Sequence, residues 1–98
     1  MSEPKGGVTL IIIQEAQAGS EAKSDILVML EPAEQGSGIR ILLQSPVELE
    51  FGRQIRQTLQ AVLKENGVTD AVVKAQDKGA MDFTIRARME TAVRRALK

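Results

Sequence analysis

A long amphipathic segment is the feature of this sequence that most restricts its fold. Ser45 is placed to cap a helix, Pro46 fits the first helical position, and Glu48 completes a capping box. Apolar side chains then recur at helical spacing and predict a stripe that faces the core, formed by Phe51, Ile55, Leu59, Val62 and Leu63. Asn66-Gly67 tolerates left-handed backbone geometry and ends the predicted helix.

The remaining segments alternate between β-like runs and one more helix. Runs rich in β-branched and aliphatic residues predict strands over 8–13, 26–30, 39–44 and 68–76. Gln35–Gly38 turns the chain, so residues 26–44 are expected to form a hairpin. The apolar spacing from Ile85 to Val93 predicts a second helix over residues 81–97.

The order of these elements, β-loop-β-β-α-β-α, predicts an α+β two-layer sandwich. We expect a small, mostly antiparallel sheet with both helices packed on one face, and the pattern leaves open whether the last strand is parallel to a neighbour. The 98 residues, 43% of them hydrophobic, are enough for a single domain, 1–98, with its own core. Residues 1–7 are expected to be disordered, and residues 14–25 to form an exposed loop.

The composition removes most catalytic and binding chemistry. The chain has no His and no Cys, so a serine triad, a thiolate nucleophile and most zinc sites are excluded, and we expect no metal. Its formal net charge is +0 and its only aromatic residues are two Phe, which argues against nucleic acid or a membrane as a partner. Its apolar runs fall far short of the ~20 residues of a membrane span, and its amino end has no signal-like apolar core, so we expect a cytoplasmic protein.

The loop before the second predicted strand is the most informative polar segment. It presents two hydroxyls, Ser20 and Ser24, among small residues. On pattern alone an ordinary connection is favoured, in which Ser24 or Asp25 makes a local turn hydrogen bond. The functional alternative is a serine that another enzyme modifies, because exposed loops are accessible to such enzymes.

Three stretches carry the motifs of a known family. They are A-G-x-x-x-x-S-D at 18–25, V-E-x-x-F-G-x-x-I-R at 47–56, and D-K-G-A-M-D followed by I-R-A-R-M-E over 77–90. In this order and at this spacing they resemble the citrate lyase acyl carrier protein, the gamma chain of that complex. The resemblance extends from about residue 18 to residue 97 and makes the whole chain similar to a single acyl-carrier domain.

The resemblance implies a carrier subunit that catalyses no reaction itself. Family members hold a phosphoribosyl-dephospho-coenzyme A group, attached by a dedicated transferase and joined to a loop serine by a phosphodiester. The terminal thiol of this arm carries acetyl as a thioester. The alpha subunit, a transferase, exchanges acetyl for citryl, and the beta subunit, a lyase, cleaves citryl to oxaloacetate and restores the acetyl thioester. A chain without Cys must import any thiol it uses, and tethering raises the effective concentration of the thioester at each active site.

The loop departs from the family pattern at the attachment residue. Without gaps, the modified serine of the family aligns with Lys23, and Ser24 follows one place later, directly before the family-like Asp25. We therefore predict attachment at Ser24, with Ser20 as the second choice and an unmodified carrier-like paralogue as the third reading. Lys23 would neutralise the charge of the phosphodiester or, more simply, be a solvated surface residue.

Asp25, the arginines of the second predicted helix and the segment that begins at Asp77 are candidate contacts for the arm or for a partner. Arg86 and Arg88 lie two apart on the predicted helix and so point to different sides, which argues against a joint clamp. Asp77, Lys78 and the glycine that follows them would shape a docking surface or, equally well, form a tight turn that caps the second helix.

Two other functions remain open on the sequence alone. The carrier subunit of malonate decarboxylase bears the same arm, and residues 26–32 look somewhat like it, whereas residues 77–80 favour the citrate lyase family. An unmodified interaction domain is the alternative from a different class. An independent enzyme is disfavoured by the missing His and Cys.

Overall fold

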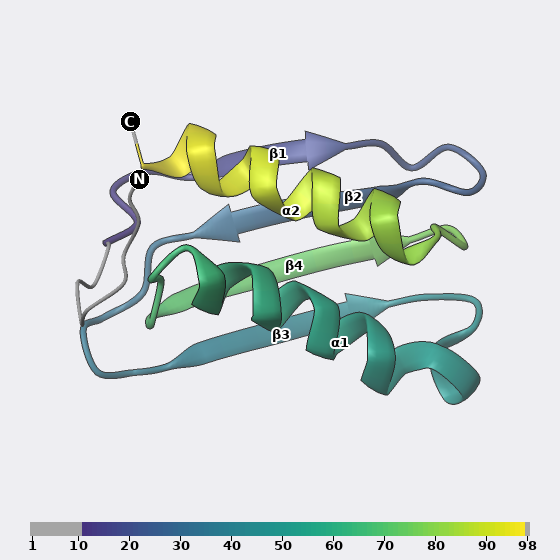
Figure 1. Ribbon diagram of the computed structural model, residues 1–98, viewed down its shortest axis with the longest axis horizontal. Helices are drawn as coiled ribbons and strands as arrows, with labels where there is room; N and C mark the ends of the chain where they lie inside the picture. The colour runs from purple at the N-terminus through teal and green to yellow at the C-terminus, as the bar shows by residue number, and fades with distance from the viewer. Residues whose placement is uncertain (1–10, 98) are drawn as a thin grey trace.

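The computed structural model describes residues 11–97, in which two helices cover one face of a four-stranded sheet (Figure 1). Along the chain the elements are β1 (Ala16–Gly19), β2 (Ile26–Glu31), β3 (Ile39–Gln44), α1 (Glu48–Glu65), β4 (Ala71–Asp77) and α2 (Asp82–Ala96). The predicted α+β two-layer architecture is confirmed. The disorder expected for residues 1–7 lies outside the described residues. Neither helix in the described part of the chain has the length and apolar content to cross a membrane.

The strand order β1-β2-β4-β3 shows that the predicted hairpin over residues 26–44 is wrong. β2 does not pair with β3, because β4 lies between them, antiparallel to β2 and parallel to β3. A parallel pair needs a crossover connection, and α1 supplies it between β3 and β4. β3, with only Leu43 buried, suits an edge, whereas β4 buries every second residue from Ala71 to Asp77 and suits the centre. The sheet is mostly antiparallel, as expected, because β1 is also antiparallel to β2.

The first strand is displaced from its predicted position. Residues 8–10 of that prediction lie outside the described residues, and Ile11–Ile13 are not part of the sheet. β1 lies instead within the predicted loop 14–25. Its small side chains allow a close approach by α2, since a Cβ added to Gly19 would lie 3.3 Å from Cδ of Arg88. Strand propensity favours β-branched residues, so it did not identify β1, in which small residues allow close packing against α2.

The core lies between the sheet and the two helices. Its largest fully buried aliphatic side chains come from the helix-facing side of the sheet, from α1 and α2, and from the connection after α1: Ile26, Val28, Leu30, Leu59, Val62, Leu63, Val68, Val73, Met89 and Val93. The predicted stripe of α1 is confirmed from Ile55 to Leu63, but Phe51 is 51% exposed and does not belong to the core. Phe51 falls in the first turn of α1, which projects past the ends of β3 and β4 (Figure 1).

The predicted capping box at the start of α1 is also wrong. The N-cap is Val47, and no side chain caps the helix. The Ser45 hydroxyl accepts a hydrogen bond from the Val47 N–H (3.1 Å) and donates one to the Asp77 carboxylate (2.7 Å). Ser45 therefore ties the start of α1 to the end of β4, and the helix begins after it. The predicted end of the helix is confirmed, because Asn66 is the C-cap and Gly67 has a φ of 77°.

Candidate functional site

The loop between β1 and β2, residues 20–25, lies at the end of the sandwich where both helices begin (Figure 1). Ser20, Lys23 and Ser24 are all exposed in this loop. Two backbone hydrogen bonds join the loop to the β4–α2 connection: the Ser24 N–H donates to the Lys78 carbonyl (2.8 Å), and the Lys78 N–H donates to the Asp25 carbonyl (2.9 Å). The two connections therefore form one surface, with the loop serines at its rim.

Ser24 has an uncommon backbone conformation. Its φ is 65°, and within residues 11–97 it is the only residue other than glycine with a positive φ. The left-handed region costs an ordinary L-residue about 1–2 kcal/mol, so a serine remains there only where its surroundings hold it. The hydrogen bonds to Lys78 on either side of the Ser24 peptide provide that hold. The loop consequently presents Ser24 in one defined conformation.

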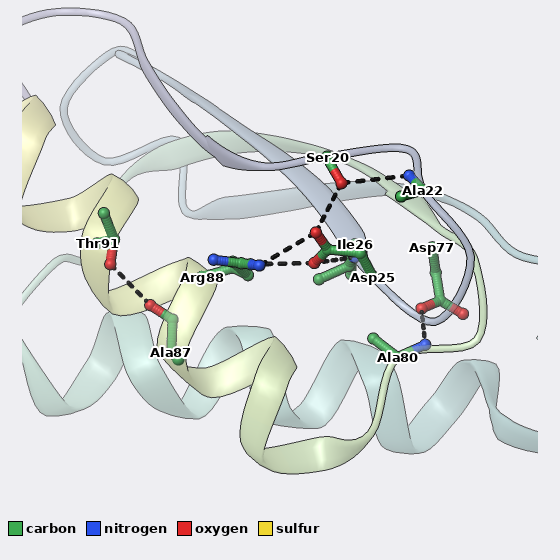
Figure 2. A network of polar contacts seen from close by, with 9 residues as sticks. All are labelled: Ser20, Ala22, Asp25, Ile26, Asp77, Ala80, Ala87, Arg88 and Thr91. Atoms are coloured by element: carbon green, nitrogen blue, oxygen red, sulfur yellow. Dashed lines mark hydrogen bonds and ion pairs between the residues drawn. The ribbon is translucent and has the colours of Figure 1, made fainter.

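The Asp25 carboxylate organises the rest of the loop (Figure 2). It accepts two hydrogen bonds from the Arg88 guanidinium, at 3.0 and 3.1 Å, one from the Ser20 hydroxyl at 2.7 Å and one from the Ile26 N–H at 2.7 Å. The hydrogen bond from Arg88 is the largest cause, followed by that from Ser20, and together they lower the pKa of Asp25 to about 2. Asp25 is therefore ionised at neutral pH and holds the loop against α2.

The two loop hydroxyls differ in what they bind. Ser20 Oγ donates to Asp25 and accepts a hydrogen bond from the Ala22 N–H (3.2 Å), so it shapes the turn. The Ser24 hydroxyl forms no side-chain hydrogen bond with any residue of the described part of the chain. A transferred group on Ser24 would leave the loop's hydrogen bonds intact, whereas one on Ser20 would break its bond to Asp25.

The Asp77–Gly79 segment forms the tight turn considered above. The Asp77 side chain is buried, and its carboxylate accepts hydrogen bonds from the Ser45 hydroxyl (2.7 Å) and the Ala80 N–H (2.9 Å). Gly79 has a φ of 90°, which favours glycine there. The N-cap of α2 is Met81 without a side-chain cap, so Asp77 stabilises the turn and does not cap the helix directly.

The two candidate arginines point to different sides of α2, as the spacing predicts. Arg86 donates to Glu65 at the end of α1 (2.6 Å), whereas Arg88 donates to Asp25 in the serine loop. Of the predicted contacts for an arm or partner, Lys23 and Lys78 lie exposed beside Ser24. Asp77 is instead buried in the turn, and Asp25 and Arg88 are bound to each other.

Sequence reasoning selected Asp25 and Arg88 separately and missed that they form a pair. The two residues are 63 positions apart, on a loop and on the last helix, and no local pattern joins them. It also missed that both phenylalanines lie exposed at the same end of the molecule, Phe51 in α1 and Phe83 in α2. No local pattern joins the two rings, because they lie on different helices.

The site holds an acceptor hydroxyl and no catalytic machinery in the part of the chain that the structure describes. No group of three or more His, Cys, Asp or Glu side chains within residues 11–97 is placed to hold a metal ion. The Asp25 carboxylate, the nearest acid in sequence to Ser24, is occupied by Arg88 and Ser20. Such an arrangement can accept a group that another enzyme transfers, but it has no base with which to activate the serine itself.

The chain is similar in sequence and in fold to proteins of known families. The family model described as the malonate decarboxylase delta subunit matches residues 13–96. The citrate lyase acyl carrier protein of Streptococcus uberis is 51% identical over 85 residues, 87% of this chain and 82% of the relative. That of Halothermothrix orenii is 39% identical over 87 residues, 89% of this chain and 90% of the relative. A chain of the Pseudomonas malonate decarboxylase hetero-tetramer has the same fold, with a TM-score of 0.73 and 19% identity over 90% of this chain and 89% of that one.

Proposed function

Because the chain belongs to the citrate lyase acyl carrier protein family, and is thus a non-catalytic carrier subunit, we propose that Ser24 bears its coenzyme A-derived arm. The arm is phosphoribosyl-dephospho-coenzyme A, joined to Ser24 by a phosphodiester, and it supplies the thiol that carries acetyl and citryl as thioesters. The alpha and beta subunits of a citrate lyase complex are the proposed partners that act on those thioesters, and a separate prosthetic-group transferase is the proposed partner that attaches the arm.

The observation that carries this proposal is the contrast between the two loop serines. Ser24 is exposed, its side chain is not engaged by residues 11–97, and its peptide is fixed on both sides by Lys78. Ser20 is exposed as well, but its hydroxyl donates a hydrogen bond to the Asp25 carboxylate and accepts one from the Ala22 N–H. A transferase can reach Ser24 without disrupting the fold.

The surroundings of Ser24 fit a phosphodiester. Lys23 precedes Ser24, and Lys78 lies across the hydrogen-bonded turn, so two exposed ammonium groups would flank a negative charge on Ser24. Arg88 is committed to Asp25 and therefore holds the loop rather than the arm. Asp25 and Arg88 are positioning residues in this proposal.

Intact-mass measurement after coexpression with the prosthetic-group transferase and its precursor tests the proposal. The wild-type chain and Ser20→Ala are expected to gain the mass of one arm, and peptide mapping should locate it on Ser24. Ser24→Ala should gain none, whereas Ser37→Ala, a change at another exposed turn serine, should be modified normally. An adduct on Ser20 would reassign the site, and an unmodified wild-type chain would favour the interaction-domain alternative.

The malonate decarboxylase carrier subunit is the second candidate, favoured by the family model that matches residues 13–96. Reconstitution distinguishes the two functions. The arm-bearing chain, with its thiol first acetylated, is mixed with citrate lyase alpha and beta subunits and should then release oxaloacetate from citrate. Release of carbon dioxide from malonate with decarboxylase subunits, and no reaction with the citrate lyase subunits, would support the second candidate instead.

A further inference from the structure

The only two aromatic side chains of the chain are both exposed, and they line the same hollow. Phe51 is 51% exposed at the start of α1, and Phe83 is 71% exposed at the start of α2. A small protein with two rings gains most by burying them in its core, where Phe contributes more apolar area than most side chains. Exposed apolar groups gathered in one place indicate a binding surface.

The hollow between the starts of the two helices has a volume of about 540 Å³, the size range of a small-molecule site. Apolar side chains form most of its lining, with Ile55 as a buried member and Met81, 64% exposed, near its mouth. Two polar groups stand among them, the Gln54 amide and the Asp82 carboxylate. Asp82 accepts one hydrogen bond from Thr58 (2.6 Å), and a carboxylate has capacity for further donors.

The hollow adjoins the serine loop. The Lys78 carbonyl accepts the Ser24 N–H, and the next residue, Gly79, already lines the hollow. The loop, the β4–α2 connection and the starts of both helices lie together at one end of the sandwich (Figure 1). A group attached to Ser24 therefore starts close to this hollow, next to the residue that precedes Gly79 in the chain.

We propose that the hollow binds the adenine ring of the arm carried by Ser24, with the ring stacked on Phe51 or Phe83. This inference rests on the proposed function. Among the parts of phosphoribosyl-dephospho-coenzyme A, only adenine has an aromatic face, and aromatic side chains bind bases through such faces. The phosphoribosyl unit joins the serine to the adenosine, so adenine belongs to the attached end of the arm and the thiol to the distant end. Asp82 and Gln54 can pair with the exocyclic amino group and ring nitrogens of adenine.

Adenine bound in this hollow would divide the arm into a fixed part and a mobile part. The attached end would be held against the protein, and the pantetheine end would remain able to move between active sites. Holding part of the tether shortens the mobile length and so raises the effective concentration of the thiol near the carrier.

A titration of the unmodified protein with free dephospho-coenzyme A tests this site directly. We expect the Met81 methyl and the Phe51 and Phe83 ring resonances to shift through the ring current of adenine, and pantetheine, which lacks adenine, to leave them in place. Phe83→Leu should raise the dissociation constant at least about fivefold, because base–aromatic stacking is lost. Leu49→Ala, a change at a fully exposed apolar residue that does not line the hollow, is the matched control and should bind as the wild type does.

The same resonances in the arm-bearing protein separate this inference from the proposed function. An arm on Ser24 by mass, with Met81 and the two rings unshifted from the unmodified protein, would overturn the adenine site and leave the carrier function standing. Binding of free dephospho-coenzyme A in the hollow, with no arm on Ser24, would support the adenine site and overturn the proposed function. Shifts that appear only when alpha or beta subunits are added would assign the hollow to a protein partner and also overturn the adenine site.

Discussion

Replacement of Arg88 by Met should loosen the serine loop and remove a pH-dependent part of the stability. Arg88 donates two hydrogen bonds to Asp25 and is the largest cause that lowers the pKa of that carboxyl from 3.8 to about 2. A shift of that size corresponds to about 2 kcal/mol at full strength. The Arg88 side chain is 42% exposed, so solvent screens the pair and we expect a loss of about 1 kcal/mol. Methionine keeps an unbranched apolar stem beside Gly19.

The sign of the pH dependence follows from the lowered pKa. A carboxyl whose pKa is lower in the folded state stabilises the fold when the pH is above the unfolded value of 3.8. This stabilisation is lost as the pH falls from 3.8 toward 2, where the folded carboxyl also takes up its proton. Urea unfolding should therefore show a difference between wild type and Arg88→Met that is largest near neutral pH and shrinks at acid pH.

Direct titration of the Asp25 carboxyl by NMR gives the decisive measurement. The pKa should lie at about 2 in the wild type and rise toward 3.8 in Arg88→Met, while the Ser24 and Lys78 amides exchange faster. Arg86→Met is the matched control, since its partner is Glu65 and it should leave Asp25 and the loop amides unchanged. An equal effect of the two substitutions, or a difference that does not depend on pH, would refute a role of the Arg88–Asp25 pair in holding the loop.

Three further tests, with five substitutions in all, examine how the structure is held together, and each is measured as the free energy of unfolding. Leu59→Ala in the core should cost about 2–5 kcal/mol, whereas Phe51→Ala should cost less than about 1 kcal/mol, because Phe51 is half exposed; equal losses would place Phe51 in the core. Gly19→Ala should be strongly destabilising, since its Cβ would lie 1.9 Å from a backbone oxygen, and Gly36→Ala, with a similar φ and open space, should cost only about 1–2 kcal/mol. Asp77→Ala should cost about 1–3 kcal/mol by leaving two hydrogen-bond donors without their acceptor, and a neutral result would mean that water replaces it.

The helices could be predicted because their signals are local. The apolar spacing from Ile55 to Leu63 and from Ile85 to Val93 determined which faces are buried, and the structure confirms both. The β-like character of β2, β3 and β4 was equally local. Strand pairing was not local. After β3 and α1 the chain returns and places β4 between β2 and β3, and this order depends on the whole sheet rather than on any one segment. Neighbouring strands in sequence were therefore paired wrongly.

The candidate site could be predicted only in part, for the same reason. The loop with Ser20 and Ser24 was found from its composition and from family motifs. The contacts that separate the two serines, from Asp25 to Ser20 and from Lys78 to Ser24, depend on a loop folded against another connection. The Arg88–Asp25 pair depends on how α2 lies over β1, which no single segment encodes.

The two wrong expectations about α1 and one unpredicted feature of the serine loop share one place in the molecule. Ser45 binds Asp77 instead of capping α1, and Phe51 lines the hollow instead of packing in the core. Ser24 has a left-handed backbone conformation beside Lys78. The start of α1 and the loop between β1 and β2, which hold these residues, lie at the end of the sandwich where the helices begin (Figure 1). Local rules that fail together at one site indicate that the residues there were selected for something other than stability. Under the proposed function, the carrier presents a serine to one enzyme and a thioester to two others, and this end is where that selection would act.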